Sequence, residues 1–372
     1  MRWCLSCVPS LVKSSNRLLC VIAIGLSAAF ALPVMAQENS TVFTTLQMEM
    51  HSEPEPIADS RDDWGSRFEA GERQWLQSEL EFGIRYRGVE LSVERRALAD
   101  LRLNSEAAEF YGRLSRREPL TQGETVPVHI DINGFAADGL RLGYRYQKAR
   151  SWVGVSGALL QASHLMSGGL DGSFTATSEQ DYDFNALVNY YYYRDPVFGR
   201  PDVEKPTGLG WSFRILGHWQ VGEHWWLNAR ADDLLAKIRW KDAPYTDAEA
   251  HTNRKRYDEQ GFAIFDPLLS GREGYQDRFY QKLDPRYQVT AGFSRGGWSG
   301  HVKGRRQFDY SLFGAGGGYR FDENVKLQAS VWPALDALDL ELEYGRFRLG
   351  ISMDDVEWQD LKFFNLNLAY GY

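Results

Sequence analysis

The amino-acid sequence predicts an all-β protein, an antiparallel transmembrane β-barrel that occupies residues 78–372. Three observations carry this prediction: side chains alternate between apolar and polar along many short segments, an export signal precedes them, and the last nine residues alternate up to a terminal tyrosine. Aromatic residues make up 14% of the chain, and 35 glycines stand against 13 prolines. This mix favours twisted strands over a helical bundle.

Residues 1–36 have the features of a Sec signal peptide. Three basic residues precede an apolar stretch, Leu18–Leu32, and Ala36 offers a small residue for cleavage before Gln37. All three cysteines lie in this segment, so the mature chain would cross the oxidising periplasm without a disulfide. An uncleaved membrane anchor is the alternative, and the shortness of the apolar stretch disfavours it.

Residues 37–77 are polar and acidic. The stretches 52–56 and 59–63 show no apolar period, so we expect a loosely held periplasmic leader. The alternative is a plug that folds back into the mouth of the barrel.

Five rows of alternating side chains define a sheet with two unlike faces: 80–86, 140–146, 211–215, 287–293 and 325–331. A soluble sandwich would turn the apolar face inward, whereas a membrane barrel turns it toward lipid. For a barrel, the charged face lines a polar lumen. The predicted lumen-lining charges are Arg85, Arg87, Arg141, Arg145, Arg214, Glu341, Glu343, Arg346 and Arg348.

The clearest hairpin spans 338–351. A two-residue turn at Tyr344-Gly345 would match every apolar residue with an apolar one and every charge with its opposite. The predicted pairs are Glu343 with Arg346, Leu342 with Phe347, Glu341 with Arg348, and Leu340 with Leu349. A slip of one residue would turn one apolar row to the wrong face.

The end of the chain decides between sandwich and barrel. Apolar or aromatic side chains fill every second position back from the last residue: Phe364, Leu366, Leu368, Tyr370 and Tyr372. This row resembles the C-terminal signal of Gram-negative outer-membrane barrels. The resemblance implies a closing strand that contacts outer-membrane lipid and is recognised by the outer-membrane assembly machinery.

The number of strands should be even, because both ends of the chain are expected in the periplasm. Fourteen strands are preferred, with 78–96 as one long bulged strand; a hairpin near Gly88 and a further strand at Val126–Ile132 would give 16. The short connectors on which this count depends are 147–150, 178–181, 220–223, 295–297, 321–324 and 344–345, and the longer ones are 166–172, 194–208, 241–284 and 353–361.

Two long insertions interrupt the strands. The insertion at 97–127 contains a segment, Ser105–Leu114, with one apolar side, which predicts a short helix. The insertion at 241–284 is charged and irregular, and strand alternation places it outside the cell as a surface loop, with binding or lid roles as alternatives.

No residue set predicts catalysis, a cofactor or a metal. The seven histidines lack metal spacing. Ser299 and His301 share a strand face, but the surrounding residues do not form a nucleophile elbow. Asp232-Asp233 and Asp354-Asp355 lie where alternation breaks, which favours turn or loop-edge roles. With 42 basic and 50 acidic residues, the chain is not suited to bind nucleic acid.

The segment 208–213, Gly-Leu-Gly-Trp-Ser-Phe, precedes a strand that ends at Asp232-Asp233-Leu234-Leu235. This hairpin resembles that of long-chain fatty-acid transporter-type barrels, over roughly 30 residues. The leading functional hypothesis is therefore a passive outer-membrane channel or transporter of unknown solute. A structural or assembly barrel that acts through its loops or leader is the alternative, followed by an outer-membrane lipid hydrolase.

Overall fold

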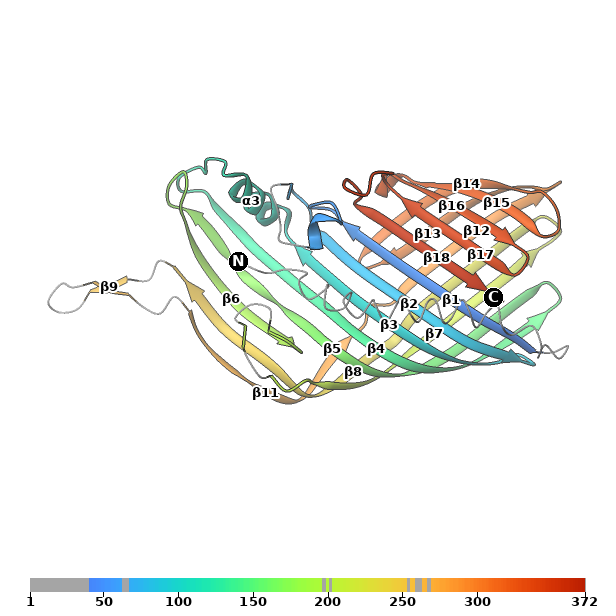
Figure 1. The fold of residues 1–372 in the computed structure, drawn as a ribbon, viewed down its shortest axis with the longest axis horizontal. Coiled ribbons are helices and arrows are strands. Elements are labelled where there is room, and N and C mark those ends of the chain that lie inside the picture. The colour runs from blue at the N-terminus through green and yellow to red at the C-terminus, as the bar shows by residue number, and fades with distance from the viewer. Residues whose placement is uncertain are drawn as a thin grey trace.

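Fourteen antiparallel strands close into a barrel in the computed structural model (Figure 1), which describes residues 40–61, 67–195, 199–200, 203–252, 255–257, 263–265 and 269–371. The ring consists of β1 (Ser40–Ser52), β2 (Arg73–Tyr86), β3 (Val89–Leu103), β4 (Thr125–Lys148), β5 (Ser151–Ala176), β7 (Thr207–Val221), β8 (Trp225–His251), β12 (Arg286–Arg295), β13 (Trp298–Gln307), β14 (Tyr310–Arg320), β15 (Val325–Trp332), β16 (Ala337–Tyr344), β17 (Phe347–Met353) and β18 (Phe363–Tyr370). β18 pairs with β1, where Leu368 lies opposite Leu46, and closes the ring.

Two further strands extend one side of the wall. β6 (Tyr182–Tyr192) pairs with the C-terminal parts of β5 and β8, and β11 (Leu269–Lys282) pairs with β8. β4, β5 and β8 have 24, 26 and 27 residues, whereas β17 has 7. The barrel is therefore tall from β3 to β11 and short from β13 to β1, as the overhang on the left of Figure 1 shows. A small hairpin, β9 (Lys255–Tyr257) and β10 (Ala263–Phe265), follows β8.

The two ends of the barrel differ in their connections. Short turns at 87–88, 149–150, 222–224, 296–297, 321–324 and 345–346 lie at the end where β1 begins and β18 finishes. The opposite end carries the longer segments 53–72, 104–124 and 354–362. We call these the turn end and the loop end. In outer-membrane barrels, short turns face the periplasm and long loops face the exterior.

The predicted leader is wrong for the part of 37–77 that the structure describes. Residues 40–52 form β1, which lies in the wall between β18 and β2, and 73–77 begin β2. The alternation was hard to recognise because Phe43 lies on the inward face among Thr45, Gln47 and Glu49, and Thr44 interrupts the apolar row on the other face. The signal peptide, the cleavage site and Tyr372 lie outside the described residues.

The preferred count of fourteen is confirmed, but two strands missed in its derivation are offset by two counted in excess, because the predicted connector at 166–172 divided β5 and because β6 lies outside the ring. The stretch 78–96 is a hairpin whose turn lies at Arg87-Gly88, not one long strand. Val126–Ile132 belongs to the same strand as Leu140, because a bulge between Gly134 and Ala136 carries β4 onward. The second missed strand is β1.

Three predicted connectors are corrected as well. Residues 166–172 lie within β5, and most of 241–284 lies within β8 and β11. The turn at 177–181 is at the loop end, because β5 overshoots the ring before β6 returns. At 166–172 and 241–284, the polar outward face of a strand that extends beyond the apolar surface was read as a loop.

The C-terminal hairpin turns one residue later than predicted. The turn is Gly345-Arg346, so Glu343 pairs with Arg348, Leu342 with Leu349 and Leu340 with Ile351. This shift leaves every side chain of the two strands on its predicted face, because a change of two residues in register does not exchange the faces; Arg346 moves into the turn. Gly345 adopts φ +58, the left-handed conformation that favours glycine at a tight turn.

The predicted helix is confirmed as α3 (Ser105–Arg116), between β3 and β4 at the loop end. Its buried side includes Ala107, Ala108 and Phe110. A Cβ on Gly112 would lie 2.2 Å from the carbonyl oxygen of Phe68, so glycine allows the helix to touch the 53–72 segment. In the described part of the chain, no helix is long and apolar enough to cross a membrane.

Candidate functional site in the barrel lumen

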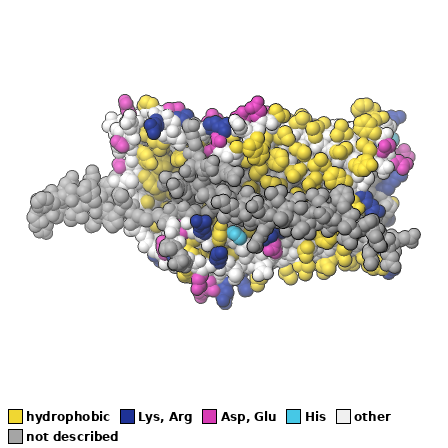
Figure 2. All heavy atoms as spheres, viewed as in Figure 1, with side chains coloured by type: hydrophobic (Ala, Val, Ile, Leu, Met, Phe, Trp, Pro, Cys, Tyr) yellow, Lys and Arg dark blue, Asp and Glu magenta, His cyan; other side chains and the backbone are white. Residues whose placement is uncertain are grey.

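The outer surface of the turn-end half is apolar. Large exposed side chains on neighbouring strands form a continuous belt, visible as the yellow surface on the right of Figure 2; it includes Val93, Leu142, Phe213, Val302, Phe313 and Leu340. Leu142 is 61% exposed and Leu340 48%. Exposure of so large an apolar surface to water is unfavourable, whereas contact with lipid acyl chains is favourable. Leu340 and Leu342 point outward, as the sequence predicts.

The arrangement is reversed in the loop-end half. There the interior is an apolar core in which Phe110 of α3 stacks on Phe174 of β5, with ring centroids 5.1 Å apart. Most outward side chains at this level are polar, and His129 contacts both Asp131 (3.0 Å) and Asp171 (2.5 Å). Hydrogen bonds from both carboxylates, chiefly that of Asp171, raise the pKa of His129, which lies on the solvent-exposed extension.

The lumen of the turn-end half holds a buried set of charges that we call the lumenal network. Its acids and bases come from β2, β3, β4, β7, β8 and β12, and five carboxylates face five guanidinium groups: Glu79, Glu81, Glu94, Asp232 and Asp233 against Arg96, Arg141, Arg214, Arg230 and Arg286. Because the formal charges are equal in number, the network can be buried without a net charge.

Arg214 of β7 is the centre of this network. Its Nη1 donates to Glu81 Oε2 (2.7 Å) and its Nε to Asp232 Oδ1 (2.5 Å), while Nη2 contacts Glu79. The Arg214 and Glu79 side chains are each 5% exposed. Removal of one partner from such a group leaves a buried charge without its counter-ion.

The network joins opposite walls of the barrel. Arg286 of β12 donates to Gln77 of β2 (3.1 Å) and lies 3.6 Å from Glu79, although β2 and β12 are six strands apart in a ring of fourteen. Arg96 of β3 likewise bonds Asp233 of β8 (2.6 Å). Side chains of the wall therefore cross the lumen at this level.

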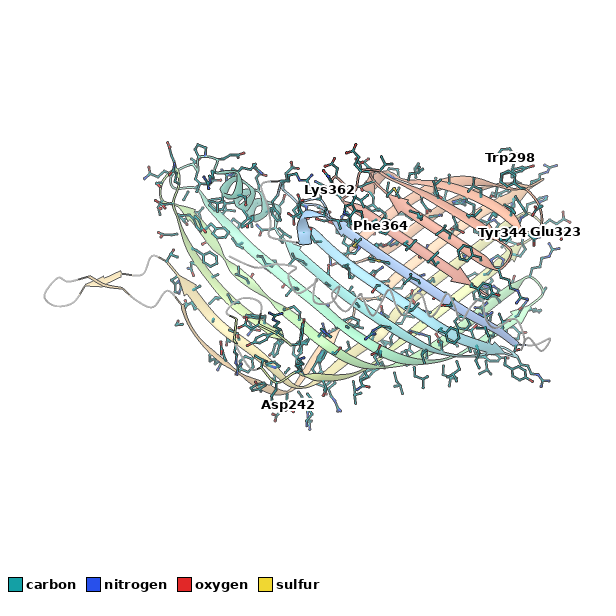
Figure 3. All side chains as sticks on the ribbon, viewed as in Figure 1. Asp242, Trp298, Glu323, Tyr344, Lys362 and Phe364 are labelled. Atoms are coloured by element: carbon teal, nitrogen blue, oxygen red, sulfur yellow. The ribbon has the colours of Figure 1, made fainter. Side chains whose placement is uncertain are left out.

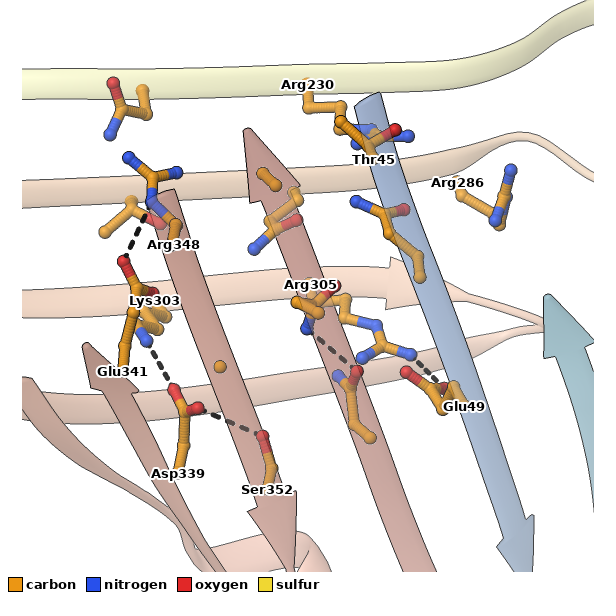
Figure 4. A pocket seen from close by; sticks show the side chains of 18 of the residues that line it. Thr45, Glu49, Arg230, Arg286, Lys303, Arg305, Asp339, Glu341, Arg348 and Ser352 are labelled. Carbon is orange, nitrogen blue, oxygen red and sulfur yellow. Dashed lines mark hydrogen bonds and ion pairs between the residues drawn. The ribbon is translucent and has the colours of Figure 1, made fainter. Parts of the chain in front are cut away.

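A second group of polar side chains lies beside the network and lines a cavity (Figure 4). Glu49 accepts hydrogen bonds from Trp75 Nε1 (2.7 Å) and Gln307 Nε2 (2.6 Å) and pairs with Arg305 across the lumen. Lys303 Nζ donates to Asp339 Oδ2 (2.5 Å), which lies on the opposite side of the same space. The cavity has a volume of about 490 Å³.

The two ends of the cavity differ in their lining. An apolar cluster that includes Leu312, Trp332, Leu335 and Phe363 lines it at the loop end. Exposure of its charged side chains rises toward the turn end, from 12% at Asp339 through 24% at Glu341 to 50% at Arg348. The space is thus a vestibule that faces the periplasmic side.

Seven of the nine predicted lumen charges face the lumen. Arg141 bonds Glu94 (2.7 Å), and Arg85 and Arg145 share Glu90 near the turn end. Arg348 contacts Glu341 (3.3 Å) and Glu343 (2.8 Å), and Arg214 is described above.

Arg87 and Arg346 are the two exceptions. Arg87 occupies the β2–β3 turn and lies over the Tyr86 ring, and Arg346 occupies the β16–β17 turn. Both were predicted to face the lumen because the alternation of apolar and polar side chains was extended beyond the end of the strand into the turn.

Eight of the ten residues of the lumenal network were missed from the sequence, which predicted only Arg141 and Arg214. Glu79 and Glu81 flank Leu80 in an alternating row and were detectable as partners for the arginines. Asp232 and Asp233 were assigned to a turn, which is wrong, because both are buried within β8. Asp233 has φ +57 at a bulge, and this bulge lets two consecutive residues face inward.

The other residues considered for chemistry have different contacts. His301 bonds Ser330 Oγ (2.8 Å), whereas Ser299 Oγ donates to the carbonyl oxygen of Gly318. Carboxylate oxygens of Glu79, Glu81 and Glu94 lie within 4.8 Å of one another, yet arginines already pair with all three. Asp354 accepts from the backbone N–H groups of Lys362 and Phe363, which matches its predicted loop-edge role.

A closed barrel with an apolar outer belt and a charged interior defines the chain as an outer-membrane β-barrel protein. No family model and no curated protein matches the sequence. Three similar solved structures are channels or transporters by their descriptions.

The Pseudomonas putida toluene transporter TodX has a TM-score of 0.39 and 11% identity, with 90% of this chain and 88% of that chain covered. A "TodX deltaS2S3 mutant monoaromatic hydrocarbon channel" has a TM-score of 0.43 and 10% identity, with 91% of each covered. The Ralstonia pickettii toluene transporter TbuX has a TM-score of 0.30 and 9% identity, with 89% and 88% covered. At this level of similarity, none of the three assigns a solute to this chain.

Proposed function

We propose that this protein is a passive outer-membrane channel or transporter whose lumen the lumenal network holds shut. The observation that carries the proposal is a polar vestibule of about 490 Å³ that ends at a layer of side chains rather than at a continuous wall of backbone. Side chains can exchange ion-pair partners, so the layer is a gate that can open without unfolding the barrel.

The chemistry of the lumen favours a polar solute. A solute that crosses must replace contacts made by guanidinium and carboxylate groups, and polar or charged groups can do so, whereas a hydrocarbon would leave those groups without partners. Lys303, Asp339, Glu341 and Arg348 give the vestibule both signs of charge, which suits small zwitterions or sugars.

Export and assembly complete the proposal. The chain would be exported through its Sec signal, cleaved near Ala36, and inserted by the outer-membrane assembly machinery through β18, against outer-membrane lipid. β18 turns Leu366 and Leu368 to the same face as Ile351 and Leu349, which supports a lipid-facing closing strand. Removal of Tyr370–Tyr372 should block insertion, as judged by the loss of heat-modifiable migration in outer-membrane fractions.

Conductance across planar bilayers tests the gate. The double variant Glu79→Gln/Arg214→Gln removes the central ion pair but keeps polar side chains at both positions, so we expect open-channel events at least several times more frequent than in the wild type. The matched control is Glu343→Gln/Arg348→Gln, an ion pair at the open mouth of the vestibule, which should leave the frequency of opening unchanged.

Two results would contradict the proposal. If the Glu79→Gln/Arg214→Gln variant folds but shows no conductance, a structural or assembly role is favoured instead. Equal opening in both double variants would place the gate elsewhere. Swelling of liposomes in arabinose, compared between the same variants, extends the test from ions to a neutral polar solute.

A further inference from the structure

The outer face of the tall wall carries five cations on two adjacent strands, which we call the cationic patch. Lys237, Arg239 and Lys241 point outward from β8, and Arg278 and Lys282 from β11. Two acids accompany them in the chain, Asp242 and Asp277. The patch is therefore locally positive, although the whole chain has a formal net charge of −8.

The pairing of the two strands places like charges directly opposite each other. Lys237 lies across from Lys282, and Lys241 lies across from Arg278. Directly opposite residues of an antiparallel pair have their Cβ atoms roughly 5 Å apart, and like charges there destabilise the sheet. Two such pairs side by side indicate that a counter-ion reduces the repulsion in the protein's working environment.

The protein itself supplies little of that counter-charge. Within the described residues, Arg239, Arg278 and Lys282 have no acidic partner within 4.0 Å, and Lys241 contacts only Asp242 (3.5 Å). Lys237 instead places its Nζ 4.0 Å from the centre of the Tyr280 ring. Lys241 is 78% exposed, so its ammonium group is free to meet a ligand.

The position of the patch identifies the kind of ligand. Outward side chains of β8 change in order along the strand, from Leu235 (84% exposed) through the three cations to Asp247 and Glu249 in the polar extension. Leu209 and Trp211 of β7 lie beside Arg239 and Lys237 and belong to the apolar belt. The patch thus lies at the edge of the belt that faces the loop end, where lipid headgroups begin. Asp242, labelled in Figure 3, lies in this region.

We propose that the cationic patch binds the phosphate groups of a lipid in the extracellular leaflet. Lysine and arginine donate charge-assisted hydrogen bonds to phosphate oxygens, and the belt below them holds the acyl chains of the same molecule. The aromatic side chains of Trp211 and Tyr280 lie at the level where such rings favour the membrane interface.

Lipid binding can be measured with the full-length mature barrel in nonionic detergent. The probe is bisphosphorylated lipid A, and the readout is its dissociation constant from titration by native mass spectrometry. Lys241→Gln/Arg278→Gln should weaken binding roughly tenfold or more, since two contacts to phosphate are lost. The matched control, Arg150→Gln/Arg295→Gln at the turn end, also removes two exposed cations and should bind as the wild type does.

Two further arms separate the phosphate from other sources of affinity. The wild type should bind lipid A without phosphate weakly. Its affinity for this lipid should not exceed the affinity of the double variant for bisphosphorylated lipid A. Inorganic phosphate at millimolar concentration should not displace the lipid; displacement would mean a site for free anions and would overturn the assignment to a lipid. Equal lipid binding by the double variant and the control would also overturn it.

Thermal unfolding gives a second measurement that does not depend on affinity. Lys282→Gln removes one of the two like-charge pairs, so without phosphorylated lipid this variant should unfold at a higher temperature than the wild type. With bisphosphorylated lipid A the order should reverse, because the wild type gains more from the bound phosphate. The same order in both conditions would show that the patch does not bind the lipid.

Discussion

The two halves of this barrel bury opposite kinds of side chain. In the turn-end half, leucine and valine point outward and ion pairs fill the interior; in the loop-end half, phenylalanine and leucine fill the interior and charged residues point outward. The same strands, β4, β5 and β8, pass through both halves. The comparison shows that the surrounding solvent, lipid or water, decides which face of a strand is apolar.

The interiors of the two halves also differ in how they tolerate loss of a side chain. An apolar core loses contacts in proportion to the volume removed, whereas a buried ion network loses its charge balance at once. The predictions below test this difference and the boundary between the halves.

The largest effect is expected at the centre of the lumenal network. Arg214→Ala leaves Glu79, Glu81 and Asp232 without their shared cation, and we expect a loss of about 3–5 kcal/mol in the free energy of unfolding. Urea titration of the refolded barrel in lipid vesicles measures it. Arg348→Ala removes a half-exposed arginine of the same lumen and should cost less than about 1 kcal/mol. Equal losses would mean that burial does not distinguish the two sites.

The boundary between the halves can be located with two leucines that are equally exposed. Leu142 and Leu187 are 61% and 60% exposed on the outer surface, the first in the belt and the second on the extension. Leu142→Arg should cost about 2–4 kcal/mol in a bilayer. Leu187→Arg should change stability by less than about 0.5 kcal/mol, as for other water-exposed positions.

The same urea titration, performed in vesicles for both variants, provides the measurement. A substantial cost at position 187 would show that the belt extends farther toward the loop end than the exposed side chains indicate.

A smaller effect should appear on acidification at the loop end. Burial by itself would raise the pKa of Glu53, but contacts with His51, Tyr310 and the N–H of Glu72 outweigh burial and lower the pKa to about 2. A lowered folded-state pKa contributes stability above the ordinary value of 4.5, and this stability is lost as the pH falls toward 2.

The comparison of wild type with Glu53→Gln isolates this contribution. The wild type should be more stable at pH 6, and the difference should shrink steadily between pH 4.5 and pH 2.5. Glu53 remains partly solvated, so the difference should be smaller than either effect above. A difference that does not vary with pH would mean that the charge of Glu53 plays no part in holding the 53–72 segment.

Labelling tests the facing of the C-terminal hairpin without a change in stability. Residues 37–372 contain no cysteine, so single cysteines at 340, 349, 341 and 348 in this part of the chain each report one site. Fluorescent labels at 340 and 349 should be quenched by lipid-soluble reagents, and labels at 341 and 348 by water-soluble ones. The opposite pattern would show that the lipid-facing and lumen-facing sides of this hairpin are assigned the wrong way round.

Periodicity alone determined the class of fold and the faces of most strands. Leu140, Leu142 and Tyr144 were placed outward and Arg141 and Arg145 inward from a pattern of two, because a pleated strand has no other way to separate its side chains. The same local rule predicted α3 from its apolar side. It found Arg141 and Arg214 of the lumenal network for the same reason, since an arginine between two outward apolar side chains must point inward.

Only the tertiary structure decided where that pattern shifts and which charges meet. The bulge at Gly134–Ala136 moves Val126 and Val128 to the inside of the extension, and the bulge at Asp233 turns two adjacent carboxylates toward Arg96 and Arg214. A bulge depends on the strands that flank it, and an ion pair across the lumen depends on closure of the ring. The sequence therefore determined the two faces of each strand, whereas the partners of those faces arise from contacts between residues more than a hundred positions apart, which no local pattern encodes.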